Sequence, residues 1–470
     1  MPAISRDIKF GTDGSAPQNI TAVGGLVYFS ASDESGTALW RSDGTLDGTA
    51  KIRSFSSLGQ FVAVGSRLYF AAEDGSTGRE LWTTDGNTAT QVVDLNQSAG
   101  GNNSGLLGTP QLTAVGNNLY FVGSPSTADE ALYRVSGNTV TVIARSNGTL
   151  KNPDGTDNSA PIILGLANLT GIGNTLYFAG VTGVPSVPSV PMSPLRSTGS
   201  ELFSISNSAN TPTLTELQPE TTGSSPNNFT QVGSQLFMTA IVPGSNRTQL
   251  IRIDTATLGT DNPTYAVVNS SGSTLAFGTT DKLQYTVTDN GALYFAAISD
   301  LEGSEVFKLD NPAAAANNSV LDTGAAVSDI VSGLAGSTPT NLVHIGNTVY
   351  FFATNDEDIN GTLIGNGREL WSTTGTVTGI VKDISSGTNS GIAPTAEMVV
   401  YQNKLYFTAD DSTDGTELWT SDGTSNGTTA LVINAVAGEG SNPTGLTPVG
   451  NTSLFFAATD GFNGEELWSI

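Results

Sequence analysis

The sequence predicts an all-β chain folded as a single closed β-propeller, and three observations carry this prediction. One sequence unit recurs nine times along the 470 residues. Each unit reads as four short strands joined by glycine-rich turns, which is the composition of one propeller blade. The beginning of the chain also matches the strand that is missing from its end, as expected for a ring closed by its two termini.

The repeated unit is recognised by a hydrophobic strand that ends in Tyr-Phe or a close variant of this pair. The text "LTAVGNNLYF" at residues 112–121 recurs as "ITAVGGLVYF", "FVAVGSRLYF" and "LTGIGNTLYF", and looser copies follow. Successive copies lie 41 to 60 residues apart, and one four-stranded blade takes about 40 to 50 residues. The nine motifs end at Phe29, Phe70, Phe121, Phe178, Met238, Phe295, Phe351, Phe407 and Phe456.

Within each unit, four strand segments follow one another in a fixed order. A strand ending in "VG" leads through a Gly-Asn or Gly-Ser turn into an "LYFAA" strand, whose residues alternate between the two faces. An acidic turn precedes a third strand, "ELW", and a "SDGT" turn precedes a fourth, represented by residues 379–384. We therefore expect every unit to be a four-stranded antiparallel meander within one domain, residues 1–470.

The two ends of the chain complete each other. The N-terminal "SRDIKFGTDGSAP" matches "VKDISSGTNSGIAP" at residues 381–394, which is a fourth strand plus the link to the next unit. We expect residues 4–10 to pair beside residues 466–470, because closure removes an exposed sheet edge. Nine blades exceed the usual range of about four to eight, so eight blades or two smaller propellers are the alternatives. Unit 5, with "QLIRID" in place of "ELW", is the easiest to miscount.

Composition excludes several classes of function. The chain has 18 Lys and Arg against 43 Asp and Glu, a net charge of −25, which repels nucleic acid and anionic lipid. It has no cysteine, so thiol catalysis, disulfides and cysteine-ligated zinc are excluded. No apolar run approaches the roughly 18 residues of a membrane span, and the N-terminus lacks a signal-peptide pattern. We expect neither nucleic-acid binding nor direct membrane insertion.

The third strand and the turn after it carry a family resemblance. The texts "ALWRSDGT", "ELWTTDGN", "ELWSTTGT" and "ELWTSDGT" resemble the bacterial ELWxxDGT-repeat proteins. The resemblance is sharp in units 1, 2, 7, 8 and 9, whereas units 3 to 6 carry "ALY", "ELF", "LIR" and "EVF". It implies a propeller-like repeat fold and an extracellular or cell-surface location, and it implies no reaction.

All the tryptophans occupy the same position of the repeat, which predicts a structural role. We expect each ring to pack between adjacent blades, because an aromatic side chain buries a large area. The sole histidine, His344, stands where other units have Ala22, Ala63 or Ala114, and it is interpreted as a tolerated substitution. The five tryptophans are Trp40, Trp82, Trp371, Trp419 and Trp468.

Three acidic turns are the candidate ligand sites, since they share the pattern D-x3-G-x-E. We expect the Asp to accept turn N–H groups and the Glu to pair across the hairpin. Calcium is the alternative, because it prefers carboxylate and carbonyl oxygens, although two carboxylates per turn are few for the six to eight or so oxygens required. No catalytic residue and no other cofactor is predicted. The candidates are Asp74 and Glu80, Asp411 and Glu417, and Asp460 and Glu466.

The leading functional hypothesis is a non-enzymatic structural or interaction module, secreted or surface-associated. Its protein or glycan partner would bind the irregular loops of units 3 to 6, within residues 146–337, among them the proline-rich segment 181–200. The Asp and Glu residues repeat around the ring, whereas an active site would be singular. A calcium-stabilised structural repeat and a carbohydrate-active hydrolase or lyase are the alternatives. The sequence predicts neither the identity of a partner nor an oligomeric state.

Overall fold

The computed structural model describes most of the chain, and every structural statement below concerns the described residues. They are residues 2–96, 103–126, 129–146, 160–182, 199–215, 217, 223–233, 235–259, 263–270, 273–277, 283–310, 312, 320–323, 326–355, 365–434 and 438–470.

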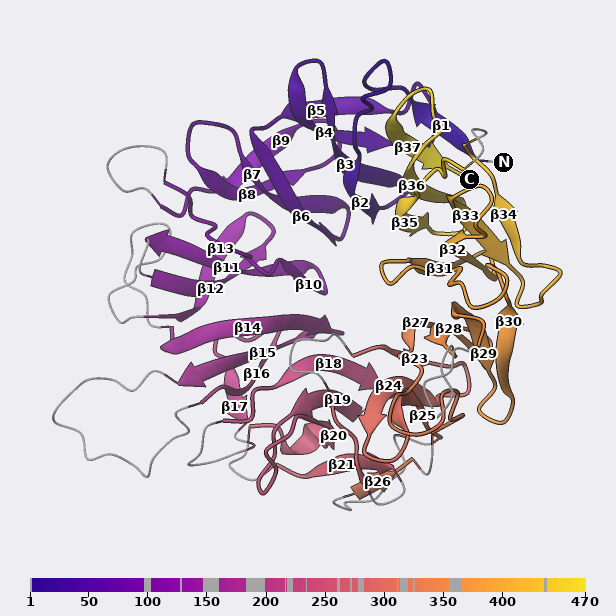
Figure 1. The fold of residues 1–470 in the computed structure, drawn as a ribbon. Helices are drawn as coiled ribbons and strands as arrows, with labels where there is room; N and C mark the ends of the chain where they lie inside the picture. The colour runs from indigo at the N-terminus through magenta and orange to yellow at the C-terminus, as the bar shows by residue number, and fades with distance from the viewer. Residues whose placement is uncertain are drawn as a thin grey trace.

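Nine sheets surround a central opening and form a propeller with nine blades (Figure 1). The nine-unit prediction is therefore confirmed, and unit 5 is a blade of its own. In each blade the first strand of the unit lies innermost, and successive innermost strands contact one another around most of the ring. Leucine, tyrosine, phenylalanine and alanine recur in the second strands, and leucine with tryptophan recurs in the third, as suits strands buried on both faces.

The blades are numbered from the first complete unit. Blade 1 consists of β2 (Gln18–Val23), β3 (Leu26–Asp33), β4 (Gly36–Ser42) and β5 (Ala50–Ser54). Blade 2 consists of β6 (Ser57–Val64), β7 (Arg67–Glu73), β8 (Arg79–Thr84) and β9 (Ala89–Val93). Blade 3 consists of β10 (Thr113–Val115), β11 (Asn118–Ser126), β12 (Asp129–Ser136) and β13 (Thr139–Arg145). Blade 4 consists of β14 (Ile163–Ile172), β15 (Thr175–Thr182), β16 (Glu201–Ser206) and β17 (Thr213–Thr215).

The remaining blades follow the same order. Blade 5 contains β18 (Asn227–Val232), β19 (Gln235–Ala240), β20 (Gln249–Ile253), β21 (Tyr265–Ser270) and β22 (Ser273–Thr274), and blade 6 contains β23 (Tyr285–Val287), β24 (Leu293–Ser299) and β25 (Gly303–Leu309). Blade 7 consists of β27 (Thr340–Ile345), β28 (Thr348–Thr354), β29 (Arg368–Thr373) and β30 (Thr378–Lys382). Blade 8 consists of β31 (Met398–Tyr401), β32 (Lys404–Asp410), β33 (Thr416–Ser421) and β34 (Thr429–Leu431). Blade 9 consists of β35 (Thr444–Val449), β36 (Ser453–Thr459), β37 (Glu465–Ser469) and β1 (Ala3–Arg6).

Blades 5 and 6 depart from the expected four-stranded pattern. The segment β26 (Val320–Asp322), which follows the third strand of blade 6, pairs in parallel with β21 of blade 5. Leu321 thereby enters a hydrophobic core shared by blades 5 and 6. The burial of this leucine accounts for a fourth strand that joins the neighbouring blade instead of its own. The only helix in the described residues is one 3₁₀ turn, η1 (Thr255–Thr257), and no helix there is long and apolar enough to cross a membrane.

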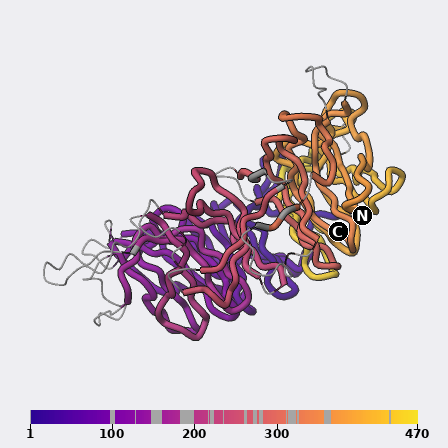
Figure 2. The backbone as a smooth tube through the Cα atoms, turned by 90° about the horizontal axis from the view of Figure 1, so that it is seen from below, coloured from indigo at the N-terminus to yellow at the C-terminus, as the bar shows by residue number. Residues whose placement is uncertain are grey.

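The predicted closure by an N-terminal strand is confirmed, although the pairing strand is Ala3–Arg6 and not the whole of residues 4–10. Strand β1 pairs antiparallel with β37, with Ala3 opposite Ser469 and Ile4 opposite Trp468. The backbone N–H groups of Ser15 and Ala16 both donate to the carbonyl of Glu465, which fixes the link to blade 1. The two termini consequently lie side by side on one blade (Figures 1 and 2).

The hydrophobic core lies between neighbouring blades, and the tryptophans fill it as predicted. All five tryptophan side chains are at most 8% exposed. Trp419 of blade 8 packs in one cluster with Tyr350 and Phe352 of blade 7, and Trp82 of blade 2 packs with Tyr28 of blade 1. The Trp419 indole N–H also donates to the carbonyl of Ala409 at 3.1 Å.

The glycine of the "SDGT" turn has a second task beyond the hairpin. Gly86 has φ +98°, and a Cβ built on it would meet the Tyr28 hydroxyl of the preceding blade at 2.6 Å. Gly423 has φ +89° and lies in the same way against the hydroxyl of Tyr350. Only glycine satisfies both the left-handed backbone and this close approach between blades.

Deleting residues 1–10 should lower the melting temperature and cause self-association. The deletion removes β1 and leaves β37 as an unpaired edge strand, which invites pairing with another chain. Thermal unfolding and sedimentation velocity measure the two effects. A deletion variant as stable and as monomeric as the full chain would contradict closure by β1.

Replacing Trp419 by Ala should lower the free energy of unfolding by about 3–5 kcal/mol, the usual loss for a large buried aromatic. Trp82→Ala should have a similar effect, because the two residues occupy equivalent places. Denaturant unfolding measures both. A change near zero in either variant would show that the ring is not part of the core between blades.

Candidate functional site

The aspartates of the three acidic turns bind their own turns. Asp74 Oδ1 accepts from the backbone N–H and the hydroxyl of Ser76, and its Oδ2 pairs with Arg53 at 2.9 Å. Asp411 Oδ1 accepts from the N–H groups of residues 413 and 414, and Asp460 accepts from those of residues 462 and 463. This is the turn-stabilising role expected from the sequence.

The glutamates of these turns do something that the sequence analysis did not foresee. Glu417 accepts from the backbone N–H groups of Ile433 at 3.1 Å and Ser441 at 3.0 Å, and both donors belong to the link between blades 8 and 9. The expected cross-hairpin pairing is therefore replaced by a clamp on the link to the next blade. Six glutamates form this glutamate clamp, and each is at most 2% exposed: Glu80, Glu201, Glu305, Glu369, Glu417 and Glu466.

The Asp and the Glu of one acidic turn thus bind different partners. Among the described residues, no group of three or more His, Cys, Asp or Glu side chains is placed to hold a metal ion. Calcium binding at these turns, by Asp74 and Glu80, Asp411 and Glu417, and Asp460 and Glu466, stays an alternative prediction, which melting temperatures recorded with and without calcium would test.

Burial sets the protonation of the glutamate clamp. It raises the pKa of Glu80, Glu305 and Glu369 to about 7, although the backbone N–H donors lower these pKa values in part. Burial also raises the pKa of Glu417 and Glu466. Withdrawal from water disfavours the charged form of a carboxyl group.

A second repeated position, one residue before the "LTAVG" text, ties the innermost strands together. Gln111 donates to the carbonyl of Leu166 in the next blade at 3.1 Å, and Asn168 donates to the carbonyl of Pro226 at 3.1 Å. Six of these side chains belong to residues with φ between 50° and 58°, a left-handed conformation that asparagine tolerates. We call this set the amide belt: Asn19, Gln60, Gln111, Asn168, Asn228, Gln284 and Asn341, with Glu397 and Gly445 in units 8 and 9.

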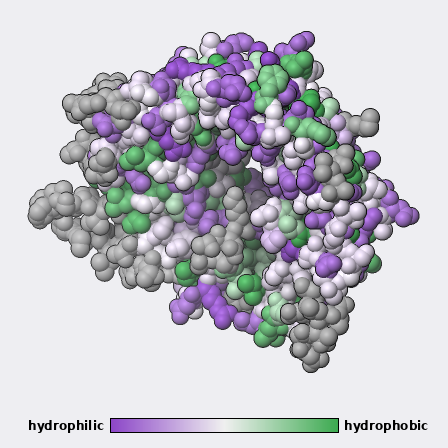
Figure 3. All heavy atoms as spheres, turned by 45° about the horizontal axis from the view of Figure 1, so that its top comes forward, coloured by the Kyte–Doolittle hydropathy of each residue, from purple (hydrophilic) through white to green (hydrophobic). Residues whose placement is uncertain are grey.

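A cavity of about 510 Å³ opens on the central channel beside the amide belt. Its lining comes from the first strands of blades 3 to 6 and the residues just before them, so it faces the axis, where the molecule is hollowed (Figures 1 and 3). No lining residue is charged. The lining consists of the amides Gln111, Asn168, Asn227 and Asn228, the threonines Thr109, Thr113 and Thr170, and the apolar or aromatic residues Leu112, Leu169, Phe229, Leu283 and Tyr285.

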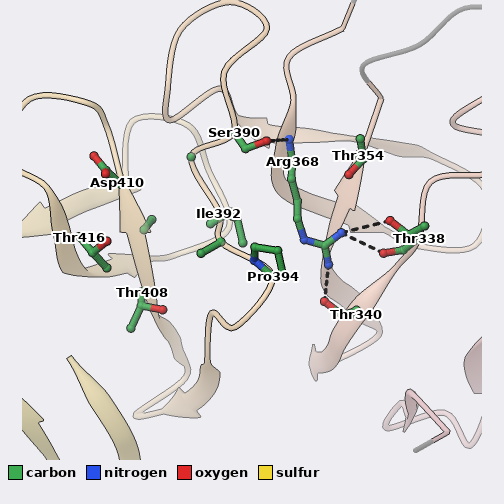
Figure 4. Close-up of a pocket in the computed structure, with 13 residues that line it drawn as sticks. Thr338, Thr340, Thr354, Arg368, Ser390, Ile392, Pro394, Thr408, Asp410 and Thr416 are labelled. Atoms are coloured by element: carbon green, nitrogen blue, oxygen red, sulfur yellow. Dashed lines mark hydrogen bonds between the residues drawn. The ribbon is translucent and has the colours of Figure 1, made fainter. Parts of the chain in front are cut away.

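A larger cavity of about 550 Å³ lies between blades 7 and 8 (Figure 4). Arg368, at the start of β29, lines it and is 8% exposed, and burial lowers the pKa of its guanidinium. Asp410, at the end of β32, lines the wall contributed by blade 8. The sequence analysis singled out neither residue.

His344 has partners that the sequence analysis did not anticipate. Its Nδ1 lies 2.8 Å from the Thr286 hydroxyl, and its Nε2 lies 3.6 Å from a carboxylate oxygen of Asp289. These are the residue types of a hydroxyl nucleophile and its base. The Thr286 side chain is largely buried at 8% exposure, so in this arrangement the histidine serves to join blades 6 and 7.

No family model and no curated protein matches the chain. Among solved structures, a prolyl endopeptidase matches with 12% identity and a TM-score of 0.41 over 86% of this chain and 55% of its own. Prolyl oligopeptidase B from Galerina marginata matches with 10% identity and a TM-score of 0.40 over 87% and 57%. The β-propeller domain of the Trilobed protease from Pyrococcus furiosus, described as having an open velcro topology, matches with 11% identity and a TM-score of 0.33 over 79% and 98%.

These findings correct the functional expectation. The chain was expected to be a non-enzymatic module with a protein or glycan partner at the loops of units 3 to 6, and the comparisons run against this expectation, since the matching structures are peptidases and hydrolases. At such identities the likeness concerns the propeller fold alone. The chain spans little more than half the length of the prolyl endopeptidase and prolyl oligopeptidase chains.

The loops expected to bind a partner fall largely outside the described residues. The residues outside the described part include 183–198 of the proline-rich segment 181–200, and also 147–159 and 313–319.

Stability should fall as the pH rises from about 4.5 to about 7. The folded pKa of Glu80, Glu305 and Glu369 lies above the ordinary value, so the folded chain binds more protons than the unfolded chain in this window. The stabilisation that these three glutamates contribute is complete below the pKa that they have in the unfolded chain. It is lost as the pH rises through their pKa in the folded chain. Melting temperatures from pH 5 to 8 measure the effect.

Glu369→Gln is the matched variant, because it keeps an acceptor oxygen and cannot ionise. Its melting temperature should vary less between pH 5 and 8 than that of the native chain. A native chain whose stability rises over this range would show that the clamp carboxylates are ionised at lower pH.

Proposed function

We propose that this chain is the substrate-binding propeller part of a peptidase-type hydrolase, and that its central channel takes up an uncharged stretch of peptide. The class of reaction is taken from the peptidases among the structural neighbours. The observation on this chain that carries the proposal is the uncharged, hydrogen-bonding cavity on the channel wall. Catalysis is assigned to no residue of this chain.

The chemistry of this cavity suits a peptide. An amide side chain has two N–H donors and an oxygen with two lone pairs. Gln111, Asn168 and Asn228, from three successive blades, can therefore bind peptide groups with the donors and lone pairs that their bonds between blades leave over. Between them, Leu112 and Leu169 are half-buried and offer apolar contacts for peptide side chains. A cavity of about 510 Å³ falls within the usual size of ligand sites, roughly 300–1,000 Å³.

The aromatic content of the cavity favours a peptide over a glycan. Tyr285 is 37% exposed and can contact a ligand, whereas the other aromatic lining residue, Phe229, is only 5% exposed. One accessible ring can cover one side chain, but it forms no extended stacking surface for sugar rings. Because the lining carries no charge, the site suits an uncharged peptide. The net charge of −25 on this protein does not repel such a ligand.

The location forms part of the proposal. We propose that the chain acts outside the cell, which is supported by the resemblance of its third strands to the ELWxxDGT repeats.

Tyr285→Ala should weaken the binding of a capped neutral hexapeptide of alanine and serine by about tenfold, because it removes the exposed ring from the cavity. Phe462→Ala is the matched control, since Phe462 is 68% exposed on the acidic turn of blade 9 and is not among the residues that line the cavity. Titration calorimetry measures the affinities, and mass spectrometry of the mixture reports any cleavage.

The proposal would be wrong if the native chain did not bind the hexapeptide, or if Tyr285→Ala bound it as well as the native chain did. An equal loss in Phe462→Ala would also count against the channel, because it would indicate general surface adhesion.

A further inference from the structure

Arg368 is a buried cation without an acidic partner among the described residues. Its side chain is 8% exposed. Nη1 donates to the carbonyl of Thr338 at 3.0 Å and to the hydroxyl of the same residue at 3.3 Å. Nη2 donates to the hydroxyl of Thr340 and, at 3.5 Å, to the carbonyl of Phe352. All of these acceptors are neutral, and the buried Nε has no hydrogen-bond partner.

Such an arrangement is unfavourable unless something else neutralises it. A buried charge is normally paired or coordinated, because withdrawal from water disfavours it strongly. Arg368 lines the cavity of about 550 Å³ between blades 7 and 8, and in Figure 4 its guanidinium lies between Thr338 and Thr340 on one side and Pro394 on the other. A negative group of a ligand in this cavity would supply the missing charge at low dielectric.

The fold itself does not require an arginine at this position. The equivalent residue is Thr37 in unit 1, Ser304 in unit 6 and Thr416 in unit 8. Unit 2 also has an arginine there, Arg79, but its guanidinium donates to the carbonyl of Gly108 at an exposed site. Arg368 is therefore a local feature of the cavity between blades 7 and 8.

The blade 8 wall of the same cavity carries a negative charge. Asp410 Oδ1 accepts from the backbone N–H of Ser412 at 2.6 Å, and its Oδ2 has no hydrogen-bond partner among the described residues. A cavity with a guanidinium on one wall and a carboxylate on another suits a ligand that carries both charges. A zwitterion also avoids the repulsion that the net charge of −25 exerts on simple anions.

We propose that the cavity between blades 7 and 8 binds a small zwitterion, a short unblocked peptide whose two charged ends are separated by peptide backbone. Its carboxylate lies beside Arg368 and its ammonium group faces Asp410. This site is separate from the channel cavity, so the two proposals stand or fall independently.

Binding of diglycine measured by calorimetry tests the proposal. Diglycine should bind, whereas its N-acetylated form and its C-terminal amide should bind at least about tenfold more weakly, since each lacks one charge. Arg368→Thr, which installs the residue found in unit 8, should weaken diglycine binding at least about tenfold. Arg79→Thr is the matched control and should leave binding unchanged.

Asp410→Asn provides a second variant that does not touch Arg368. It should remove the preference for the free amino group, so that diglycine and its N-acetylated form bind alike. The proposal is overturned if about 10 mM diglycine gives no heat with the native chain, if the capped forms bind equally well, or if Arg79→Thr weakens binding as much as Arg368→Thr does.

Discussion

The buried glutamate at the start of the third strand is the interaction on which the ring depends. A β-meander can form within one unit, but nothing in the meander sets where the next blade begins. Glu369 solves this by accepting the N–H groups of Ile384 and Gly391, which lie on the link to blade 8. Glu466 does the same across the ends of the chain, where it accepts the N–H groups of Ile8 and Lys9. Ring closure is thus one more instance of a contact repeated around the molecule.

Unit 1 lacks the clamp and also has a short link to the next blade. Unit 1 has Ala38 in place of the glutamate, and only two residues separate β5 from β6, because β5 ends at Ser54 and β6 begins at Ser57. Between β9 and β10 the chain runs from Val93 to Thr113, and there Glu80 binds two points of the link, Leu95 and Gly105. A long link leaves backbone N–H groups that must find acceptors when they are buried, and the glutamate supplies them.

Much of the fold could be predicted from the sequence, because the information lies within one unit or in the match between its ends. The strand order, the position of the tryptophans and the closure of the ring by an N-terminal strand are of this kind. The partners of Glu80 and Gln111 could not be predicted, since they lie on links of variable length or in the next blade. The cavity between blades 7 and 8 could not be predicted for a related reason. Arg368 and Asp410 belong to different units, and each stands at a repeat position whose residue type varies. The same holds for β26, which leaves its own unit to bury Leu321 in a core shared with blade 5.

The closing pair has a mechanical consequence. Strands β1 and β37 are antiparallel, and Ala3 lies opposite Ser469, so both chain ends leave the pair from the same end. A force applied between the two ends would therefore act in the unzipping geometry. It would break the hydrogen bonds between β1 and β37 one at a time, beginning beside the termini. Shear, in which all the bonds resist together, would require ends that leave from opposite ends of the pair. The ring can thus be stable against heat and yet open readily when it is pulled by its ends.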